Sequence, residues 1–499
     1  MGSTREVDEP KMQVIVLGCG GGPREDNTTA FLVRSTATKW ARGSLLAVDA
    51  GTHLAAITRI LEKHLPAKNP HDADELPHTL TEGPFKGLKI PNFSASANAG
   101  YIIRTIVDAY LITHPHLDHI SGFVINTSSL PGLAQNASLD CQHIFNNVIW
   151  PNLSDENNGA GLVTYMRLVE GGSPAMGDGE GKGYMEICEG LSVKTWSVSH
   201  GHCIEKHSHR GSNAGLPEGS PRLGPTSFSQ MERSTRSSSG RILSPADVLR
   251  TDPFDRVCVY DSSAYFIRDI ASGREVLIFG DVEPDSISLS PRNKQVWSEA
   301  APKIVAGQLG AIFIECSYDD SRSEDTLFGH LAPRYLIEEL KSLVAQVHAY
   351  NGRAKEKKKR KRVSERNELR QRSTRTSLSK DSPVSPLTRT SRRSFEFEVP
   401  QADGIEEQSD GAAAASQELT MRGQGELLLK GVKVVVIHTK EKLDDGPAIG
   451  DLILQELLDW ESEEQLGCEF YRAEVLGMRC TFRESLWSPW VVVLSMGLA

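Results

Sequence analysis

Hydrophobic positions along the chain form short, uniformly apolar runs that alternate with segments of helical spacing. Several runs are rich in β-branched residues, a pattern typical of strands in a sheet covered on both faces. Strands are predicted at 12–17, 30–34, 45–49, 110–113, 191–198, 256–259, 275–279, 311–314 and 432–437, and helices at 53–64, 332–348 and 449–464. Because strands and helices alternate, the pattern predicts an α/β layered fold.

Two segments lack this periodicity. Residues 207–241 are rich in Ser, Gly, Arg and Pro, and residues 352–426 contain the basic run KEKKKRKR at 355–362. Neither segment can bury enough apolar surface to offset its ordering entropy, so both are predicted to be disordered insertions. The prediction is therefore one discontinuous domain, residues 11–350 with 428–482, followed by a tail at 483–499 of unknown role.

The basic run at 355–362 allows three interpretations. A solvated linker is favoured slightly over a nuclear-import signal or a nucleic-acid patch. The sequence Lys361-Arg362-Val363-Ser364 resembles a site for a basophilic kinase, which makes phosphorylation of Ser364 a further hypothesis.

Composition narrows the class of protein. With 39% hydrophobic and 24% charged residues, the 499-residue chain is of ordinary globular composition. No apolar run approaches the roughly 18 to 20 residues of a membrane span, the N-terminus does not read as a secretory signal, and the eight cysteines form no C-x-x-C pair. We therefore expect a soluble protein of a reducing compartment, the cytoplasm, with nuclear entry through 355–362 as an alternative.

The net charge of −10 is unevenly distributed. Residues 353–400 hold 16 Lys and Arg against 6 Asp and Glu, a balance of +10, so the rest of the chain carries −20. Binding to nucleic acid depends on neutralising phosphates with basic side chains. An acidic body therefore argues against nucleic acid as a partner.

Candidate chemistry is concentrated in residues 113–122, THPHLDHISG, directly after a predicted strand. His114, His116, Asp118 and His119 lie within six residues of one another. Imidazole nitrogens and a carboxylate that converge at a sheet edge suit divalent metals, zinc above all. A single His would more often be a hydrogen-bonded core residue, but four potential ligands at this spacing predict a metal site.

The motif H-x-H-x-D-H after a short strand resembles the metallo-β-lactamase superfamily. This resemblance implies a four-layer αββα sandwich that holds two metal ions. The longer string HPHLDHISGFVIN is more specifically similar to the class II cyclic nucleotide phosphodiesterases, best known from fungi. The activity implied is hydrolysis of 3′,5′-cyclic AMP, with cyclic GMP as a second substrate, to the 5′-monophosphate.

The resemblance also implies further ligands at strand ends downstream. His200 follows the strand at 191–198, with His202 as a competitor, Asp281 follows 275–279, and His438 follows 432–437. The predicted ligands of one metal are His114, His116 and His200, those of the other are Asp118, His119 and His438, and Asp281 bridges the two. Zn²⁺ is expected, with Mn²⁺ or Mg²⁺ as alternatives.

Glu315 and His330 resemble a pair in the phosphodiesterase branch of the superfamily. The resemblance places His330 beside the scissile phosphate, as a substrate contact or as the acid that protonates the leaving group. Asp49 resembles a residue that supports the metal loop, although a structural Asp at a strand end is as good an interpretation. In the implied mechanism a hydroxide shared by both metals attacks phosphorus, and Asp118 also orients this nucleophile.

Several alternatives remain at this point. An RNA 3′-processing endonuclease of the same fold would require a basic docking surface. Thioester or lactone hydrolysis would not require the Glu315 and His330 pair, and a regulatory scaffold acting through the basic insertion would not require a complete ligand set. The Gly-rich segment GCGGG at 18–22 lacks the Lys-Ser/Thr of a phosphate loop and predicts a tight turn. Family resemblance further suggests a homodimer.

Overall fold

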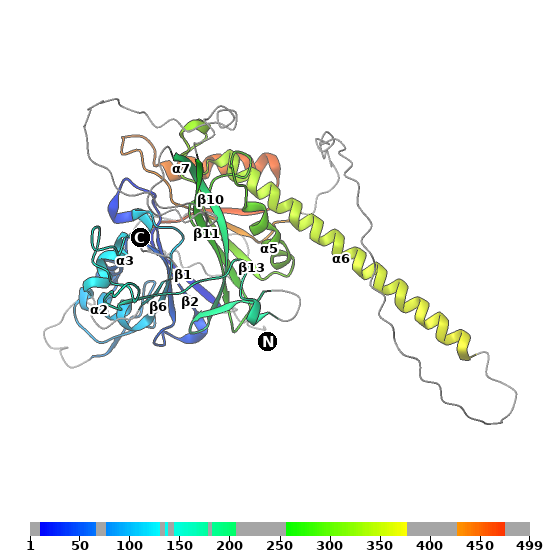
Figure 1. The fold of residues 1–499 in the computed structure, drawn as a ribbon, viewed down its shortest axis with the longest axis horizontal. Coiled ribbons are helices and arrows are strands. Elements are labelled where there is room, and N and C mark those ends of the chain that lie inside the picture. Colours follow the sequence, from blue (N-terminus) through cyan, green and yellow to red (C-terminus); the bar gives the residue numbers. More distant parts are fainter. Residues whose placement is uncertain are drawn as a thin grey trace, which may run out of the picture. The chain divides into compact units, whose positions relative to one another are not determined.

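The structure is a computed structural model. It describes residues 10–65, 76–129, 135–137, 144–177, 182–205, 256–376 and 427–474. The chain divides into two compact units, residues 1–350 with 428–499, and residues 351–427. Both large sheets belong to the first unit (Figure 1).

The first sheet has six strands in the order β1-β2-β3-β6-β7-β8. The first three are antiparallel to one another, whereas β3, β6, β7 and β8 run parallel. Their bounds are β1 Met12–Gly18, β2 Ala30–Ser35, β3 Leu45–Ala50, β6 Val107–Leu111, β7 Gln135–Ala137 and β8 Val163–Tyr165.

The second sheet has seven strands in the order β15-β14-β13-β12-β11-β10-β9. Strands β9 to β12 are antiparallel, and β12 to β15 are parallel. Their bounds are β9 Met185–Cys188, β10 Leu191–Glu205, β11 Arg256–Asp269, β12 Glu275–Phe279, β13 Leu309–Glu315, β14 Lys433–Ile437 and β15 Glu469–Arg472. A separate hairpin joins β4 His78–Thr79 to β5 Lys89–Ile90.

Helices cover the outer face of each sheet. Those on the first sheet are α1 Leu54–His64, α2 Ala95–Tyr101 and α3 Leu117–Ser129, and those on the second are α5 Asn293–Val305, α6 Pro333–Thr376 and α7 Ile449–Glu464. Short helical turns lie at Glu25–Asn27, Thr36–Thr38, Ile102–Ile106, Pro174–Met176 and Glu324–Thr326. Among the described residues, no helix is both long and apolar enough to cross a membrane.

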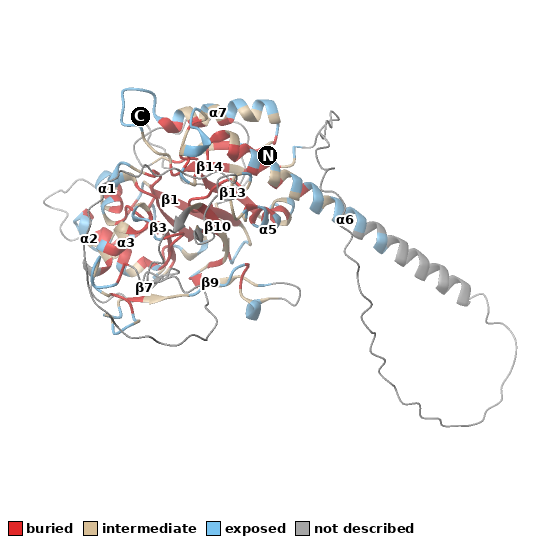
Figure 2. Ribbon diagram, turned by 45° about the horizontal axis from the view of Figure 1, so that its top comes forward, coloured by how far each residue is buried: buried red, intermediate tan, exposed pale blue. Residues whose placement is uncertain are grey.

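Three hydrophobic clusters fill the spaces between these layers. Strand β1 contributes Ile15 to the cluster beneath α1, α2 and α3, and its neighbour Val14 to the cluster between the two sheets. Phe313 and Val435 of the second sheet meet Val14 there, while Trp297 packs between the second sheet and its helices. Strands buried on both faces (Figure 2) therefore give four layers, helix, sheet, sheet and helix, as predicted.

The structure differs from the sequence-based prediction at α6. The helix was predicted to end at 348 and the insertion to begin at 352, yet α6 continues to Thr376. Lys, Arg and Glu are good helix formers, and Arg360 pairs with Glu356 one turn earlier at 2.6 Å. Residues 352–376, predicted to be disordered, are therefore helical. The insertion at 207–241 and the tail at 483–499 lie outside the described residues.

Candidate metal centre

Most of the predicted ligands gather at the carboxyl ends of parallel strands, and His200 joins them from within the antiparallel strand β10. His114 and His116 lie in the loop after β6, and Asp118 and His119 lie in the first turn of α3. Asp281 lies two residues after β12, and His438 directly follows β14. Carboxyl ends of parallel strands meet at one edge of a sheet, where α/β proteins commonly place their ligands. Residues separated by more than 300 positions in the sequence consequently share one site.

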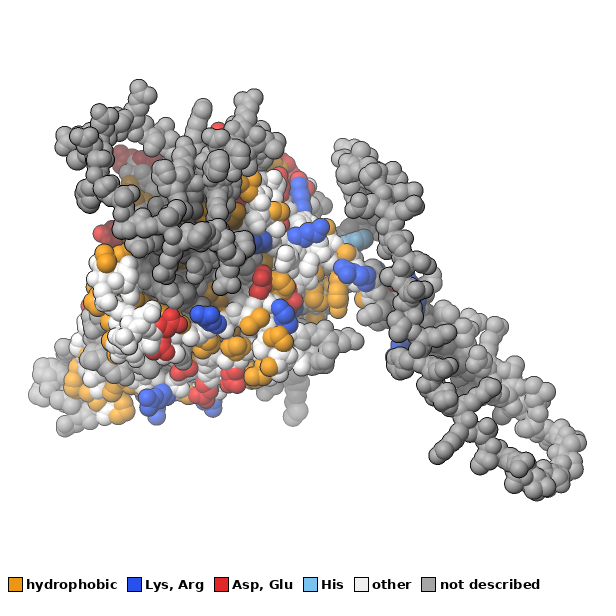
Figure 3. All heavy atoms as spheres, viewed as in Figure 1, with side chains coloured by type: hydrophobic (Ala, Val, Ile, Leu, Met, Phe, Trp, Pro, Cys, Tyr) orange, Lys and Arg blue, Asp and Glu red, His pale blue; other side chains and the backbone are white. Residues whose placement is uncertain are grey.

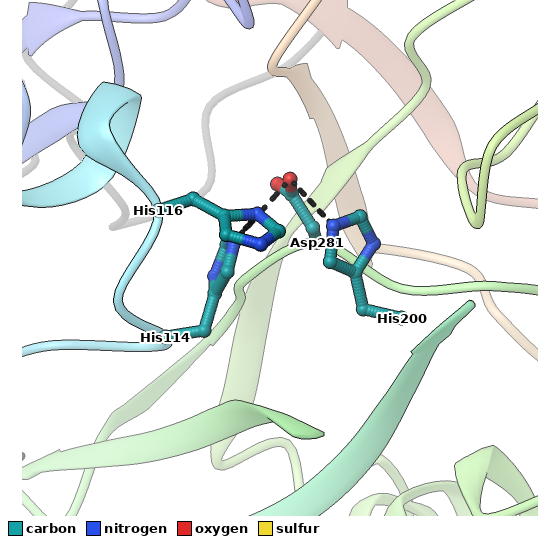
Figure 4. A group of neighbouring side chains, drawn as sticks. All are labelled: His114, His116, His200 and Asp281. Atoms are coloured by element: carbon teal, nitrogen blue, oxygen red, sulfur yellow. Dashed lines mark hydrogen bonds and ion pairs between the residues drawn. The ribbon is translucent and has the colours of Figure 1, made fainter. Parts of the chain in front are cut away.

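The first ligand group contains His114, His116, His200 and Asp281, whose potential ligand atoms all lie within 4.8 Å of one another. Figure 4 shows the four side chains pointing toward one another. His114 Nε2 lies 2.9 Å from His116 Nδ1 and 3.6 Å from Asp281 Oδ2, and His200 Nε2 lies 3.5 Å from the same oxygen. Three imidazoles and one carboxylate form a donor set that zinc prefers.

The second ligand group contains Asp118, His119, Asp281 and His438. His438 Nε2 lies 3.1 Å from Asp118 Oδ2, and both His119 Nε2 and His438 Nε2 lie 3.2 Å from Asp281 Oδ1. Asp281 therefore presents Oδ2 to the first group and Oδ1 to the second. This is the arrangement expected of a carboxylate that bridges two cations.

The buried polar atoms of this region fit a metal site. His119 Nε2 and Asp281 Oδ1 are both buried, and although they lie 3.2 Å apart, neither makes a hydrogen bond of good geometry among the described residues. Leaving such atoms unsatisfied costs about 1–3 kcal/mol each. A divalent cation between the imidazole nitrogen and the carboxylate oxygen would satisfy both.

The pKa values of the site reflect burial and crowding. Burial lowers the pKa of His114 well below its usual range and that of His200 to about 4, which keeps both rings neutral, as metal ligation requires. Burial would also lower the pKa of His119, but the carboxylates of Asp281 and Asp49 outweigh it and raise that pKa well above the ordinary value. The same negative field that attracts a proton to His119 would attract a cation.

A second layer of hydrogen bonds orients the ligands. Asp49 is fully buried and accepts from Thr113 N at 2.8 Å, from Thr113 Oγ1 at 2.9 Å and from His119 Nδ1 at 2.8 Å. His200 Nδ1 lies 2.9 Å from the carbonyl of Gly329, and His438 Nδ1 lies 3.1 Å from Ser317 Oγ. Such partners fix the ring orientation and the tautomer of a ligating histidine.

Glu315 and His330 form a pair beside the ligands. Glu315 ends β13, and its Oε1 lies 2.8 Å from His330 Nδ1. The His330 ring stacks on His438 at a centroid distance of 5.2 Å. Burial, reinforced by the charge of Asp281, raises the pKa of Glu315 to about 7, and burial lowers the pKa of His330 well below its usual range.

A β-bulge decides between His200 and His202. Ser199 pairs with Asp261 and His202 with Val259, so His200 and Gly201 both lie opposite Tyr260. Gly201 has a φ of +77°, as bulges of this kind require. The extra residue directs His200 toward Asp281, whereas His202 lies outside both ligand groups. Of the two candidates, the structure brings only His200, the favoured one, to the ligands.

The sequence-based reasoning missed the close backbone contacts around the ligands. Only a tight turn was predicted at 18–22, yet a Cβ on Gly21 would lie 2.3 Å from His438 Cε1. A Cβ on Gly51 would lie 1.9 Å from the carbonyl oxygen of Asp118. The glycines themselves were the available signal, because Gly allows the close approach of backbone to a site. The roles of Thr113 and Ser317 had no comparable signal.

Comparisons with known proteins show which family this chain resembles. The model of the family of class-II cAMP phosphodiesterases matches residues 21–214 and 224–354. A 3′,5′-cyclic-nucleotide phosphodiesterase of Schizosaccharomyces pombe is 27% identical over 67% of this chain and 75% of its own, and one of Saccharomyces cerevisiae is 26% identical over 66% and 82%.

The crystal structure of unliganded yeast PDE1 superposes with a TM-score of 0.53 at 19% identity, covering 93% of this chain and 98% of its own. This likeness supports the layered αββα fold. Because the family model covers well over half of the sequence, the chain belongs to the class-II cAMP phosphodiesterase family.

Proposed function

We propose that this chain hydrolyses 3′,5′-cyclic AMP, and also cyclic GMP, to the 5′-monophosphate with the help of two divalent cations. Family membership supports the substrate class, and the relatives bear the name 3′,5′-cyclic-nucleotide phosphodiesterase. The observation that carries the proposal is the pair of ligand groups that share Asp281, with His330 and Glu315 beside them.

The donor set favours zinc. His114, His116 and His200 would hold one cation, Asp118, His119 and His438 the other, and Asp281 both. Five imidazole nitrogens favour Zn²⁺ over Mg²⁺ or Mn²⁺, which prefer oxygen ligands. When bound, the cations supply Lewis acidity that lowers the pKa of water toward about 7 and neutralises charge on the phosphate oxygens.

The chain's own groups manage the protons. Glu315 binds His330 at Nδ1, which leaves Nε2 for the substrate. Because its pKa is raised to about 7, Glu315 can hold a proton and donate it to His330 Nδ1, so that the neutral ring carries its own proton on Nε2. As water adds to phosphorus and the bond from phosphorus to the 3′-oxygen breaks, Nε2 gives its proton to that oxygen and Nδ1 takes the proton of Glu315. The Asp118 side chain is 25% exposed, the largest value in its group, and one of its oxygens can accept a hydrogen bond from the attacking water.

The surface does not favour the RNA-processing alternative. On the face that Figure 3 shows, acidic and basic side chains of the described residues are interspersed and form no continuous basic surface. A protein that docks an RNA helix or tRNA requires many phosphate contacts. The face shown in Figure 3 therefore offers no such docking surface, which supports the small cyclic phosphate as the substrate.

Hydrolysis of cyclic AMP and cyclic GMP by the purified protein tests the proposal, with chromatography to distinguish 5′- from 3′-monophosphates and elemental analysis of bound metal. We expect 5′-AMP and 5′-GMP as products and two metal ions per chain. In His116→Ala both the turnover and the full metal content should be lost. His202→Ala is the matched control and should retain activity. Two bound metals without turnover, or 3′-monophosphate as product, would contradict the proposal.

A further inference from the structure

Two exposed aromatic side chains flank the histidine that the β-bulge directs inward. Tyr260 of β11 lies opposite His200 and Gly201, is 44% exposed, and its ring centroid lies 6.3 Å from that of His116. Phe328 is 50% exposed and precedes Gly329, whose Cα would lie 3.3 Å from a Cβ on Gly201. The segment that carries His200 therefore lies between the strand position of Tyr260 and the turn that carries Phe328.

Phe328 has an unfavourable backbone conformation. Leu327 and His330 close a turn by a backbone hydrogen bond of 3.1 Å, and its two central residues, Phe328 and Gly329, have φ of +53° and +79°. Such turns strongly prefer Asn, Asp or Gly at both central positions. A bulky residue there is a genuine outlier, and outliers of this kind concentrate at functional sites.

The ring of Phe328 contributes little to the stability of the folded protein. It is half exposed, and its one described partner is Arg322, whose Cζ lies 5.9 Å from the ring centroid. Arg322 also lies 4.6 Å from the ring of Tyr318, which in turn lies 6.0 Å from the ring of His330. Phe328 is thus linked through Arg322 and Tyr318 to His330.

We propose that Tyr260 and Phe328 bind the purine base of the substrate by stacking and so favour a nucleotide over a phosphate diester that lacks a base; this rests on the proposed function. Every purine presents an aromatic face for stacking, so stacking accepts both adenine and guanine. In the proposed complex the cyclic phosphate lies at the ligands, and the base lies beyond the ligand groups, on the side of His116 and His200. Base contacts of this kind add to substrate binding rather than to the chemical step.

The substitution Phe328→Asn separates this role from a structural one, because Asn accepts positive φ and removes the ring. We expect KM for cyclic AMP to rise about tenfold, the effect of one lost stacking contact, with kcat changed by less than about threefold. The melting temperature should not fall, since the strained residue is relieved. Phe93→Asn, at an equally exposed position before α2, is the matched control and should leave KM unchanged.

Ribose 3′,5′-cyclic phosphate, which lacks the base, is the second substrate. Phe328→Asn should leave its kinetics unchanged. On the other side of the proposed base site, Tyr260→Leu should raise KM for cyclic AMP but not for ribose 3′,5′-cyclic phosphate. Tyr260→Phe, which keeps the ring, should have the wild-type KM. Equal losses on both substrates, or an unchanged KM for cyclic AMP, would overturn the proposal. A wild-type enzyme with equal kcat/KM for both substrates refutes base binding alone, and one that hydrolyses neither refutes the proposed function as well.

Discussion

Asp49→Asn tests whether an outer carboxylate controls the second ligand group. Asp49 adopts a φ of +53°, which Asn tolerates as well as Asp, so the backbone should not change. The side-chain oxygen of Asn can still accept from Thr113 N, and its amide can donate to Thr113 Oγ1. The contact with His119 cannot be kept, because two N–H donors would face each other.

The cost follows from this one hydrogen bond. A hydrogen bond to a charged group contributes about 1.5–3 kcal/mol, and every 1.4 kcal/mol corresponds to roughly a factor of 10. His119 can avoid the clash by moving its proton to Nε2, the atom that lies 3.2 Å from Asp281 Oδ1, but a protonated nitrogen cannot bind a metal. Affinity for one of two metals should therefore fall about 10- to 100-fold, as removal of such partners typically causes.

Titration of the metal-free protein with Zn²⁺ against a chromophoric chelator measures both sites, and the rate of cyclic AMP hydrolysis follows the functional loss. Asp269→Asn is the matched control, since Asp269 is as deeply buried but caps a turn at Ser272. It should change stability without changing metal affinity. Asp49→Asn that binds both ions within a factor of two of wild type would refute the proposed role of Asp49.

Two further predictions concern histidines. His330→Gln should lower kcat by about 10²- to 10⁴-fold, the usual contribution of a general acid, while two metal ions remain bound in elemental analysis; a variant without metal would instead make His330 a ligand. Burial lowers the pKa of His53 to about 4 from 6.5, so the folded state binds fewer protons than the unfolded state between these values, and the free energy of unfolding should fall as pH drops through that window. Urea unfolding measures this effect: between pH 7.5 and 4.5 the free energy of unfolding of His53→Gln should fall by about 2 kcal/mol less than that of wild type. Equal decreases in the two proteins would contradict a buried neutral His53.

Several ligand positions were predictable because buried parallel strands appear in the sequence as short apolar runs, and the ligands lie where these runs end. Asp281, Glu315 and His438 end or directly follow the strands β12, β13 and β14, whose apolar residues are buried on both faces. A polar residue at such a strand end is easily recognised in the sequence. The topology then brings these ends together without any further information from the sequence.

Other elements gave no such signal. Strand β7 consists of Gln135–Ala137, which has neither apolar alternation nor β-branched residues. Helix α5 contains Pro302, which argues against a helix in the sequence, although Val296, Trp297, Ala300 and Ala301 form a buried face. These elements are held by tertiary packing against an existing sheet, which local pattern and propensity do not report. The extension of α6 was not predicted because the high charge of residues 352–376 was given more weight than their helix propensity.

The choice between His200 and His202 shows where a periodic argument stops. In a regular strand the two residues would point to the same face, so period-two spacing cannot separate them. The bulge adds one residue to β10 and reverses the alternation between them. Gly201 was the sign of it in the sequence, because an isolated Gly in a strand suggests a bulge or a close backbone approach. The same irregularity leaves Tyr260 facing two residues instead of one, so a single inserted residue directs a ligand inward and positions the ring that we assign to the base.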